Sequence, residues 1–304
     1  MPAPVVSAAI ATETPDYRHA GETLAAPLPP LLVAAEHVAM TVAQGVHGRR
    51  RVGQGESFWQ FRPYAFGDSP QQIDWRRSAR SDHLYIRETE WEAAQSVWFW
   101  CDQSASMKYR SNRALPEKWE RATVLNLALM SLLVRGGERI ALLDRPDRPA
   151  SGRAALNRIA AIVTARGGDD NDNGVPPAPE LPRFGSAILI GDFLAPPESI
   201  LQATRTLAAQ GIRGFMLQVL DPAEVAMPFQ GRRRFLGLED EGDLLVGRAE
   251  NLRVGYLKRL AELQDELATF ARRADWYFSV HSTEGPAQPA LLGMYTAIAD
   301  HLGL

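Results

Sequence analysis

The chain alternates short apolar runs with amphipathic stretches over most of its length. The apolar runs of strand length are residues 96–101, 138–144, 187–191, 214–220 and 276–282. The segments whose apolar spacing predicts a helix are 31–43, 116–134, 154–164, a stretch that opens at 196, 256–270 and 291–302. A continuous apolar run is typical of a strand that is buried on both faces. These runs therefore predict the interior strands of a parallel sheet.

Strands that alternate with helices at this spacing predict an α/β fold, a doubly wound and mainly parallel sheet with helices on both faces. Residues 235–246 depart from this alternation of strands and helices. Two short apolar segments there flank an acidic stretch that contains Gly242, and this pattern predicts a small β-hairpin. Residues 1–30 are rich in Pro and Ala without periodicity and predict a disordered arm. We expect this arm, then an N-terminal subdomain over 31–92 and the α/β domain over 93–304.

An Arg- and Trp-rich elaboration precedes the first predicted strand of the sheet. Residues 45–100 hold five of the seven tryptophans, and eight arginines lie between positions 49 and 87. Arginines beside aromatic residues are compatible with a nucleic-acid-binding module. Acidic residues interleave with these arginines, however, and arginine grips a carboxylate with two parallel hydrogen bonds. We favour a structural unit of paired charges and packed aromatics, in which Asp74 pairs with one or more of Arg62, Arg76 and Arg80.

Composition narrows the class of protein further. The chain has 304 residues, of which 45% are hydrophobic and 23% charged, and these are ordinary values for a globular protein. A net charge of -3 gives no bulk attraction to nucleic acid, so none is expected as a partner. The single cysteine, Cys101, forms no intrachain disulfide, which favours a reducing compartment. With no secretory signal and no apolar stretch long enough for an integral membrane segment, we expect a cytoplasmic protein.

Candidate chemistry lies directly after two of the apolar runs. The first run is followed by Asp102-Gln103-Ser104-Ala105-Ser106, a D-x-S-x-S pattern, and the run 187–191 is followed by Asp192. Open α/β sheets bind ligands at the carboxyl ends of their strands. Carboxylate and hydroxyl oxygens suit hard divalent cations, so we expect Asp102, Ser104, Ser106 and Asp192 to bind Mg²⁺ or Mn²⁺, with Ca²⁺ as a further candidate. The competing interpretation is that Asp102 and Ser104 only cap a turn or helix.

The D-x-S-x-S pattern resembles the metal-ion-dependent adhesion site of von Willebrand factor A domains, and the order of strands and helices is similar to theirs. More specifically, RPYAFGD at 62–68, IDWRRSAR at 73–80 and LYIRE at 84–88 resemble the signature of the "domain of unknown function 58" family. DPAE at 221–224 and the hairpin after it are also similar to that family. The resemblance implies a bacterial protein that works with a MoxR-type AAA+ ATPase and has no assigned catalysis.

The sequence departs from these patterns at two positions. The family often has arginine where Gln71 stands. The adhesion site expects a threonine from the loop before the third strand, where this chain has Asp169 after Gly167-Gly168. A carboxylate at Asp169 would bind the metal directly, or the site would be incomplete.

The function that follows is a non-enzymatic, metal-dependent protein-binding adaptor. The metal would keep one coordination position open for a carboxylate of the partner protein. The main alternative is a metal-dependent hydrolase of phosphoesters, since oxygen-ligated Mg²⁺ also serves that chemistry. No histidine or lysine is expected near the strand ends as a general base or charge clamp, and this disfavours the hydrolase. Motifs for a nucleophilic serine or for a phosphate-binding loop are absent from the sequence.

Overall fold

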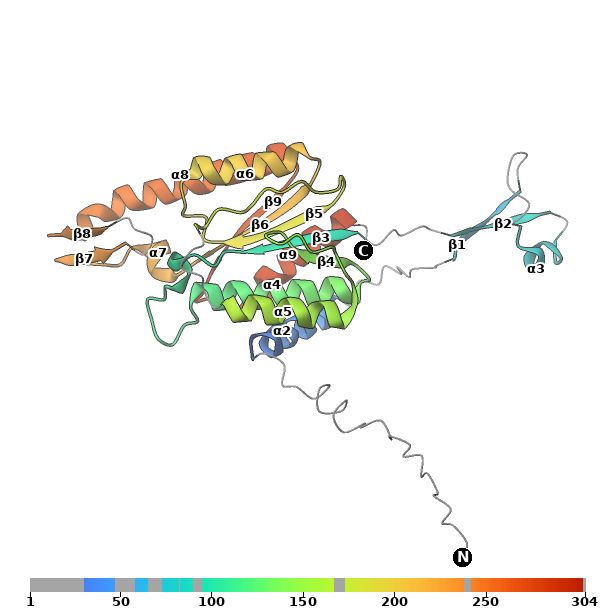
Figure 1. Cartoon of the computed structure of the whole chain (residues 1–304), viewed down its shortest axis with the longest axis horizontal. Helices are drawn as coiled ribbons and strands as arrows, with labels where there is room; N and C mark the ends of the chain where they lie inside the picture. Colours follow the sequence, from blue (N-terminus) through green and yellow to red (C-terminus); the bar gives the residue numbers. More distant parts are fainter. Residues whose placement is uncertain are drawn as a thin grey trace, which may run out of the picture.

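A computed structural model describes residues 30–46, 58–64, 73–81, 83–89, 95–166, 173–237 and 242–302 (Figure 1). Its centre is a five-stranded sheet in the order β4-β3-β5-β6-β9, in which every pair of neighbours is parallel. The strands of this sheet are β3 (Ser96–Cys101), β4 (Arg139–Leu142), β5 (Ser186–Gly191), β6 (Arg213–Leu220) and β9 (Tyr277–Ser282). The predicted fold class, an α/β protein with a parallel sheet between helices, is confirmed.

The helices connect these strands and cover both faces of the sheet (Figure 1). The longer ones are α2 (Pro30–Val46), α4 (Lys118–Arg135), α5 (Gly152–Arg166), α6 (Pro197–Ala209), α8 (Glu250–Ala274) and α9 (Ala287–Leu302). Two short ones are the 3-10 helix η2 (Ala105–Lys108) and α7 (Pro222–Ala226). Each helix that the apolar spacing predicts is present, with ends that differ by a few residues.

Alternation along the strands divides the core into two layers. In β3, Val97, Phe99 and Cys101 face the cluster that α2, α4, α5 and α9 complete. Trp98 and Trp100 face the opposite cluster, which α6 and α8 cover. Successive strand residues point to opposite faces, so a run without polar residues is what a sheet between two helical layers requires. Cys101 is buried in this layer as a free thiol.

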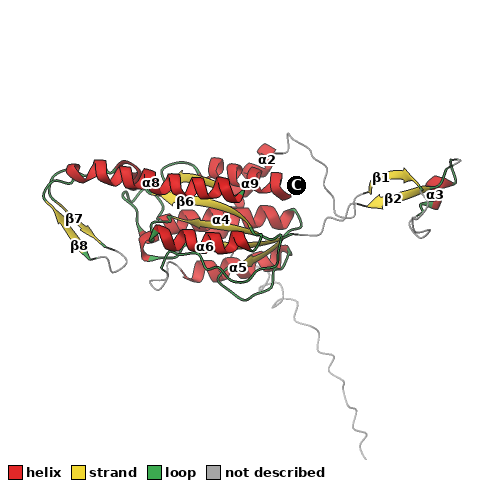
Figure 2. Cartoon of the chain, turned by 90° about the horizontal axis from the view of Figure 1, so that it is seen from above, coloured by secondary structure: helices red, strands yellow, loops and turns green. Residues whose placement is uncertain are grey.

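Two antiparallel pairs lie outside the central sheet. The predicted hairpin is confirmed as β7 (Arg233–Leu236) and β8 (Asp243–Val246), which project from the end of α8 (Figure 2). In the N-terminal elaboration, β1 (Phe58–Pro63) pairs with β2 (Tyr85–Thr89), and α3 (Trp75–Ser78) lies between them in the sequence. The predicted arm over 1–30 lies outside the described residues except for its last position.

The division at residue 92 stays a prediction, although α2 packs against α4 and α9 of the α/β domain. Leu32, Ala35 and Ala39 of α2 are fully buried in that contact.

Among the helices of the described ranges, none is both long enough and apolar enough to cross a membrane.

The charges of the elaboration are arranged differently from the expected buried network. Asp74 caps α3, since its Oδ1 accepts a hydrogen bond from the backbone N–H of Arg77 at 2.9 Å. Arg76 and Arg80 are exposed, and the Arg77 guanidinium lies over the Tyr85 ring, 5.6 Å from its centroid. The side chain of Arg62 lies outside the described part. Among the described side chains, Asp74 therefore bonds to the backbone of α3, and its pairing with Arg62 stays a prediction.

Candidate functional site

The sheet reverses its winding between β3 and β5. The chain passes from β3 to β4 on one side and then returns to β5 on the other side of β3. At such a switch point the connections leave in opposite directions, and a crevice opens at the carboxyl ends of the two strands. Asp102 follows β3, and Asp192 follows β5. The backbone N–H of Asp102 donates to the carbonyl of Ile190 at 2.8 Å, so the two strand ends are in register at this edge.

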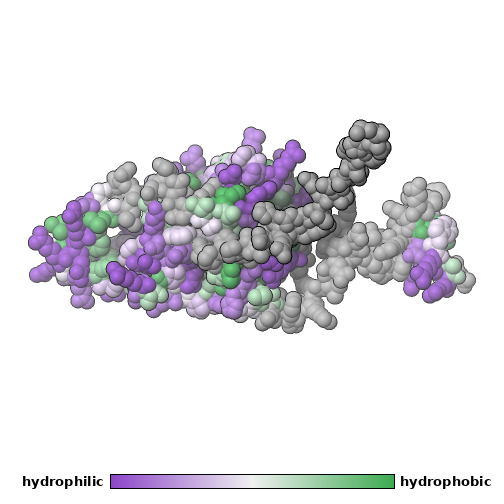
Figure 3. All heavy atoms as spheres, turned by 60° about the horizontal axis from the view of Figure 1, so that its bottom comes forward, coloured by the Kyte–Doolittle hydropathy of each residue, from purple (hydrophilic) through white to green (hydrophobic). Residues whose placement is uncertain are grey.

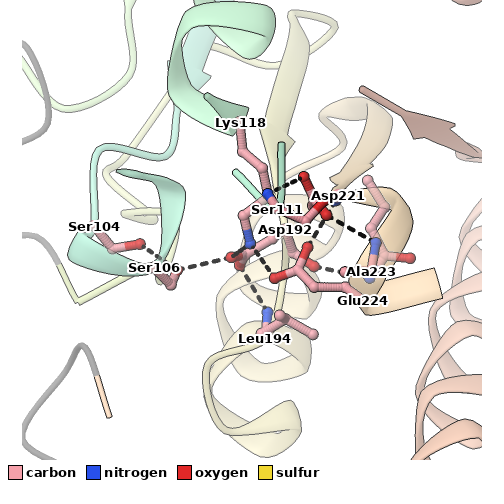
Figure 4. A network of polar contacts seen from close by, with 10 residues as sticks. Ser104, Ser106, Ser111, Lys118, Asp192, Leu194, Asp221, Ala223 and Glu224 are labelled. Carbon is pink, nitrogen blue, oxygen red and sulfur yellow. Dashed lines mark hydrogen bonds and ion pairs between the residues drawn. The ribbon is translucent and has the colours of Figure 1, made fainter. Parts of the chain in front are cut away.

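The loop after β3 carries the D-x-S-x-S side chains, and Figure 4 shows two of them, Ser104 and Ser106. Asp102 and Ser104 are fully buried, and Asp102 Oδ1 accepts the N–H of Ser104 at 2.9 Å. The hydroxyls of Ser104 and Ser106 lie 3.0 Å apart. Ser106 Oγ donates to Asp192 Oδ2 at 2.7 Å, which connects the two strand ends. Four of the five predicted site residues therefore come together.

The capping interpretation accounts for only part of this loop. Asp102 does stabilise a turn through the N–H of Ser104, as a capping aspartate would. Ser104 is the residue before η2, yet its side chain makes no capping hydrogen bond. Its hydroxyl contacts Ser106 instead, and therefore contributes to the cluster of oxygens rather than to the helix end.

A lysine that the sequence analysis missed lies at the centre of the site. Lys118 begins α4 and is 0% exposed. Its Nζ donates to Asp192 Oδ2 at 2.8 Å and to Glu224 Oε1 at 2.6 Å (Figure 4). The expectation that no lysine lies near these strand ends is therefore wrong. A signal existed, because Lys118 continues the buried stripe of α4 four residues before Ala122 and seven before Leu125.

Lys118 stays charged in this setting. Burial by itself would lower the pKa of the Lys118 amine, but the charges of Asp192 and Glu224 outweigh burial and hold that pKa above its ordinary value. An ammonium shared by two carboxylates fixes the positions of both. It thereby connects α4 to the loop after β5 and to α7.

The short helix α7 supplies the third side of the site. Asp221, fully buried, caps it by accepting the N–H of Ala223 at 2.8 Å, and it also accepts the N–H of Ser111 at 2.9 Å. Glu224 Oε2 accepts the N–H of Asp221 at 2.8 Å, which leaves the other oxygen of Glu224 for Lys118. This capping box explains why the DPAE sequence has a carboxylate at each end.

Carboxylates gather around the buried ammonium. Asp192 and Glu224 both contact Lys118, and burial, only partly offset by the charge of Lys118, raises the pKa of Glu224. On α8, burial and then the charge of Glu224 raise the pKa of Tyr256 to about 12.

The side chains at this site fit a divalent cation, because they offer carboxylate and hydroxyl oxygens as ligands. Within the described ranges no three side chains of the His, Cys, Asp and Glu types form a metal-holding group, so the candidate donors are a mixed set of carboxylates and hydroxyls. Gly174 borders this set, because a Cβ there would lie 3.5 Å from Ser104 Oγ and 3.6 Å from Asp102 Oδ2. Asp169 precedes Gly174 in the same loop and lies outside the described residues, so its part in the site stays a prediction.

His281 lies away from this cluster, as a packed residue. It is buried in β9, and its Nε2 is 3.1 Å from Nη1 of Arg121 on α4. Arg121 also donates to the carbonyls of Gly285 and Thr283. Burial and then the charge of Arg121 lower the pKa of His281 to about 4, so the imidazole is neutral and accepts the hydrogen bond from Arg121.

Comparisons with known proteins match the part of the chain that contains the segments resembling the family signature. The model of the family described as "Protein of unknown function DUF58" matches residues 60–266. The "Uncharacterized protein Rv1480" of Mycobacterium tuberculosis and the "Uncharacterized protein Mb1516" of Mycobacterium bovis are each 29% identical over 272 residues, covering 81% of this chain and 80% of theirs.

Two solved structures are similar at low scores. One is the conserved hypothetical protein BatB from Bacteroides thetaiotaomicron, with 16% identity and a TM-score of 0.37, covering 69% of this chain and 100% of that one. The other is an aerotolerance-related membrane protein from Bacteroides fragilis, with 13% identity and a TM-score of 0.38, covering 68% and 100%. Since the family model spans more than half of the sequence, the chain belongs to the DUF58 family of proteins of unknown function.

Proposed function

We propose that this protein is a non-enzymatic adaptor that binds a partner protein through a divalent cation at the carboxyl edge of the sheet. Mg²⁺ or Mn²⁺ would be held by Asp102, Ser104, Ser106 and Asp192. The observation that carries the proposal is the 2.7 Å hydrogen bond from Ser106 to Asp192, because it brings oxygens from two separate strand ends to one point. When bound, the cation would supply a Lewis-acidic position for a carboxylate of the partner.

The chain's own residues would prepare this position. Asp192 is held from three directions: by Lys118, by Ser106 and by the backbone N–H of Leu194 at 3.0 Å. Ser106 donates a hydrogen bond to Asp192, so it would meet a cation as a neutral hydroxyl ligand. Buried groups that are already oriented lose little freedom when a ligand arrives. Lys118 keeps Asp192 and Glu224 from repelling each other while the position is empty.

The partner follows from the family resemblance. The switch-point location of the D-x-S-x-S loop supports a von Willebrand factor A-like domain with a metal-ion-dependent adhesion site. The partner that this resemblance implies is a MoxR-type AAA+ ATPase in the cytoplasm. The alternative, a phosphoester hydrolase, needs a cationic group that can reach the substrate. Lys118 does not serve, since it is fully buried and already bound to two carboxylates.

Calorimetric titration with Mg²⁺ and Mn²⁺ tests the cation site. We expect weak binding to the wild type and none to Asp102→Ala. Asp144→Ala is the matched control, because Asp144 lies exposed just beyond the end of β4. Equal heats for the wild type and Asp102→Ala would remove the site from consideration.

An assay of generic phosphoesters with both metals tests the absence of catalysis. We expect no turnover by the protein alone. Turnover that is lost in Asp102→Ala would establish the hydrolase and overturn the adaptor.

A further inference from the structure

A hollow in the N-terminal elaboration shares no residue with the proposed cation site. Its volume of about 450 Å³ is in the range of small-molecule sites. Its described walls come from α3, the turn after it and the start of β2, and they consist of Asp74, Arg76, Arg77, Arg80, Ser81 and Tyr85. Figure 3 shows hydrophilic surface on the described part of the elaboration, at the right of the view. The hollow is therefore large enough for a ligand, and these side chains decide which ligand it takes.

Backbone contacts hold the walls of the hollow in place. The N–H of Asp74 donates to the carbonyl of Tyr85 at 2.8 Å, and the N–H of Tyr85 donates to Ser78 Oγ at 2.9 Å. Ser78 is buried, so α3 is fixed against the start of β2. The Arg77 guanidinium lies over the Tyr85 ring. A site that is fixed before its ligand arrives loses little freedom on binding.

Hydrogen-bond donors dominate the hollow. Each of its three arginines offers five N–H groups and no acceptor. Ser81 Oγ accepts the N–H of His83 at 3.2 Å, so the Ser81 hydroxyl can donate its own proton to a ligand. Asp74 contributes the one carboxylate of the described walls, and its Oδ1 already accepts the N–H of Arg77. The described walls therefore offer many donors and few acceptors, which is the pattern of an anion site.

The segment that forms the hollow stays positive when every acidic residue in it is counted. Residues 73–85 contain three arginines against Asp74 and Asp82. Asp82 lies outside the described residues. Arg76 and Arg80 are exposed, and no carboxylate of the described part of the chain lies within ion-pair distance of either guanidinium. These two groups are therefore available to a ligand.

We infer that the hollow binds the phosphate group of a phosphomonoester. A phosphorylated hydroxyl carries a charge of about −1.5 to −2 at pH 7 and presents three acceptor oxygens. A guanidinium donates two parallel hydrogen bonds to such oxygens. A carboxylate has one charge and two oxygens, so it would satisfy fewer of the donors. The volume of the hollow leaves room for the organic group of the ester.

Calorimetric titration of the full-length protein with glycerol 3-phosphate tests the hollow. We expect measurable binding to the wild type and at least about tenfold weaker binding to Arg76→Gln/Arg80→Gln, because two guanidiniums no longer donate charge-assisted hydrogen bonds. Arg253→Gln/Arg259→Gln is the matched control, since it removes the same charge from exposed positions of α8 and should bind like the wild type. Equal weakening by the two double variants would show that net charge alone attracts the probe, and would overturn the inference.

Vesicles separate a soluble ligand from a lipid headgroup. The proteins would be sedimented with phosphatidylcholine vesicles that contain either phosphatidic acid, a phosphomonoester, or phosphatidylglycerol, a phosphodiester. Binding to phosphatidic acid alone, lost in Arg76→Gln/Arg80→Gln, would support the inference and place the monoester on a lipid. Binding of glycerol 3-phosphate without vesicle binding would support it and place the monoester on a soluble molecule. Equal binding to the two lipids, or no binding of glycerol 3-phosphate and phosphatidic acid, would overturn it.

Two other anions test the choice of a phosphomonoester. Acetate that binds as tightly as glycerol 3-phosphate would assign the hollow to carboxylates. Single-stranded DNA that the wild type retains and Arg76→Gln/Arg80→Gln does not, without binding of glycerol 3-phosphate, would assign the arginines to phosphodiesters. Either result would overturn the inference.

The hollow should act independently of the proposed cation site. The titrations are made in EDTA, and Asp102→Ala should bind glycerol 3-phosphate like the wild type. Binding that is lost in Asp102→Ala and kept in Arg76→Gln/Arg80→Gln would place the anion elsewhere and contradict the inference. Unchanged melting temperatures for each variant would show that binding, and not folding, was altered.

Discussion

At the scale of single residues, Lys118 holds the site together. Its buried ammonium contacts Asp192 and Glu224, which come from segments about thirty residues apart in sequence. Burying an ion pair is costly, and its members are stable only when each charge keeps its partners. The three groups therefore depend on each other, and the loss of one leaves the others uncompensated.

Lys118→Met should destabilise the fold strongly. The substitution keeps most of the side-chain volume but leaves two buried carboxylates facing each other. Breaking a buried pair in this way costs about 3 to 5 kcal/mol, which urea unfolding would measure. Lys258→Met is the control, because the Lys258–Glu262 pair on α8 is exposed and separated by 3.7 Å. Equal stability of the two variants would show that Lys118 is not held as described.

His281 should make the fold sensitive to acid. Its pKa of about 4 in the folded protein lies below the ordinary 6.5, so the unfolded chain binds the proton more tightly. The stability contributed by neutral His281 is complete above pH 6.5 and is lost as the pH falls toward 4, by up to about 3 kcal/mol. Unfolding of His281→Gln from pH 7 to pH 4 should show a shallower loss than the wild type, and His37→Gln on α2 should not. Parallel curves for wild type and His281→Gln would contradict the lowered pKa of His281, whose causes are burial and then the charge of Arg121.

At the scale of elements, the apolar pattern predicted the five strands of the sheet, the longer helices and the hairpin. It succeeded because a strand buried on both faces must be apolar throughout, as Val97 to Cys101 are. Asp102 and Asp192 were predictable because the ends of adjacent parallel strands meet. Lys118 lies on the buried stripe of α4, which indicated its burial. Its contact with Glu224 was not predictable, because the partners of a buried charge are recognisable only once distant segments are in place. The short α3 and α7 depend on the caps Asp74 and Asp221 and leave too few residues for a periodic pattern.

Gly191 at the end of β5 should be essential for the position of Asp102. A Cβ at Gly191 would lie 2.7 Å from Asp102 Cβ and 2.9 Å from Asp102 Oδ2. Gly191→Ala should therefore displace the Asp102 carboxylate and weaken cation binding in the calorimetric titration. Gly255→Ala on α8 meets open space and should instead stabilise the protein by about 0.5 to 1 kcal/mol. Normal cation binding by Gly191→Ala would mean that Asp102 does not need its described position.

At the scale of the whole molecule, the features that favour protein binding gather at one end. The carboxyl edge of the sheet carries the oxygen cluster, α7 adjoins it, and the hairpin projects beyond α7 (Figures 1 and 2). The parallel sheet requires this arrangement, because every one of its strands ends at the same edge. The helical layers cover its two faces and leave that edge for the proposed site.

Cation-dependent capture of a MoxR-type AAA+ ATPase is the decisive test of the proposed function. Biolayer interferometry would compare the wild type in Mg²⁺, the wild type in EDTA, Ser104→Ala in Mg²⁺, and Ser151→Ala, an exposed serine, as the control. We expect binding by the wild type and by Ser151→Ala in Mg²⁺, and its loss both in EDTA and in Ser104→Ala, with all variants folded. Binding of the ATPase that is equally tight in EDTA and in Ser104→Ala would overturn the proposed cation-dependent adaptor.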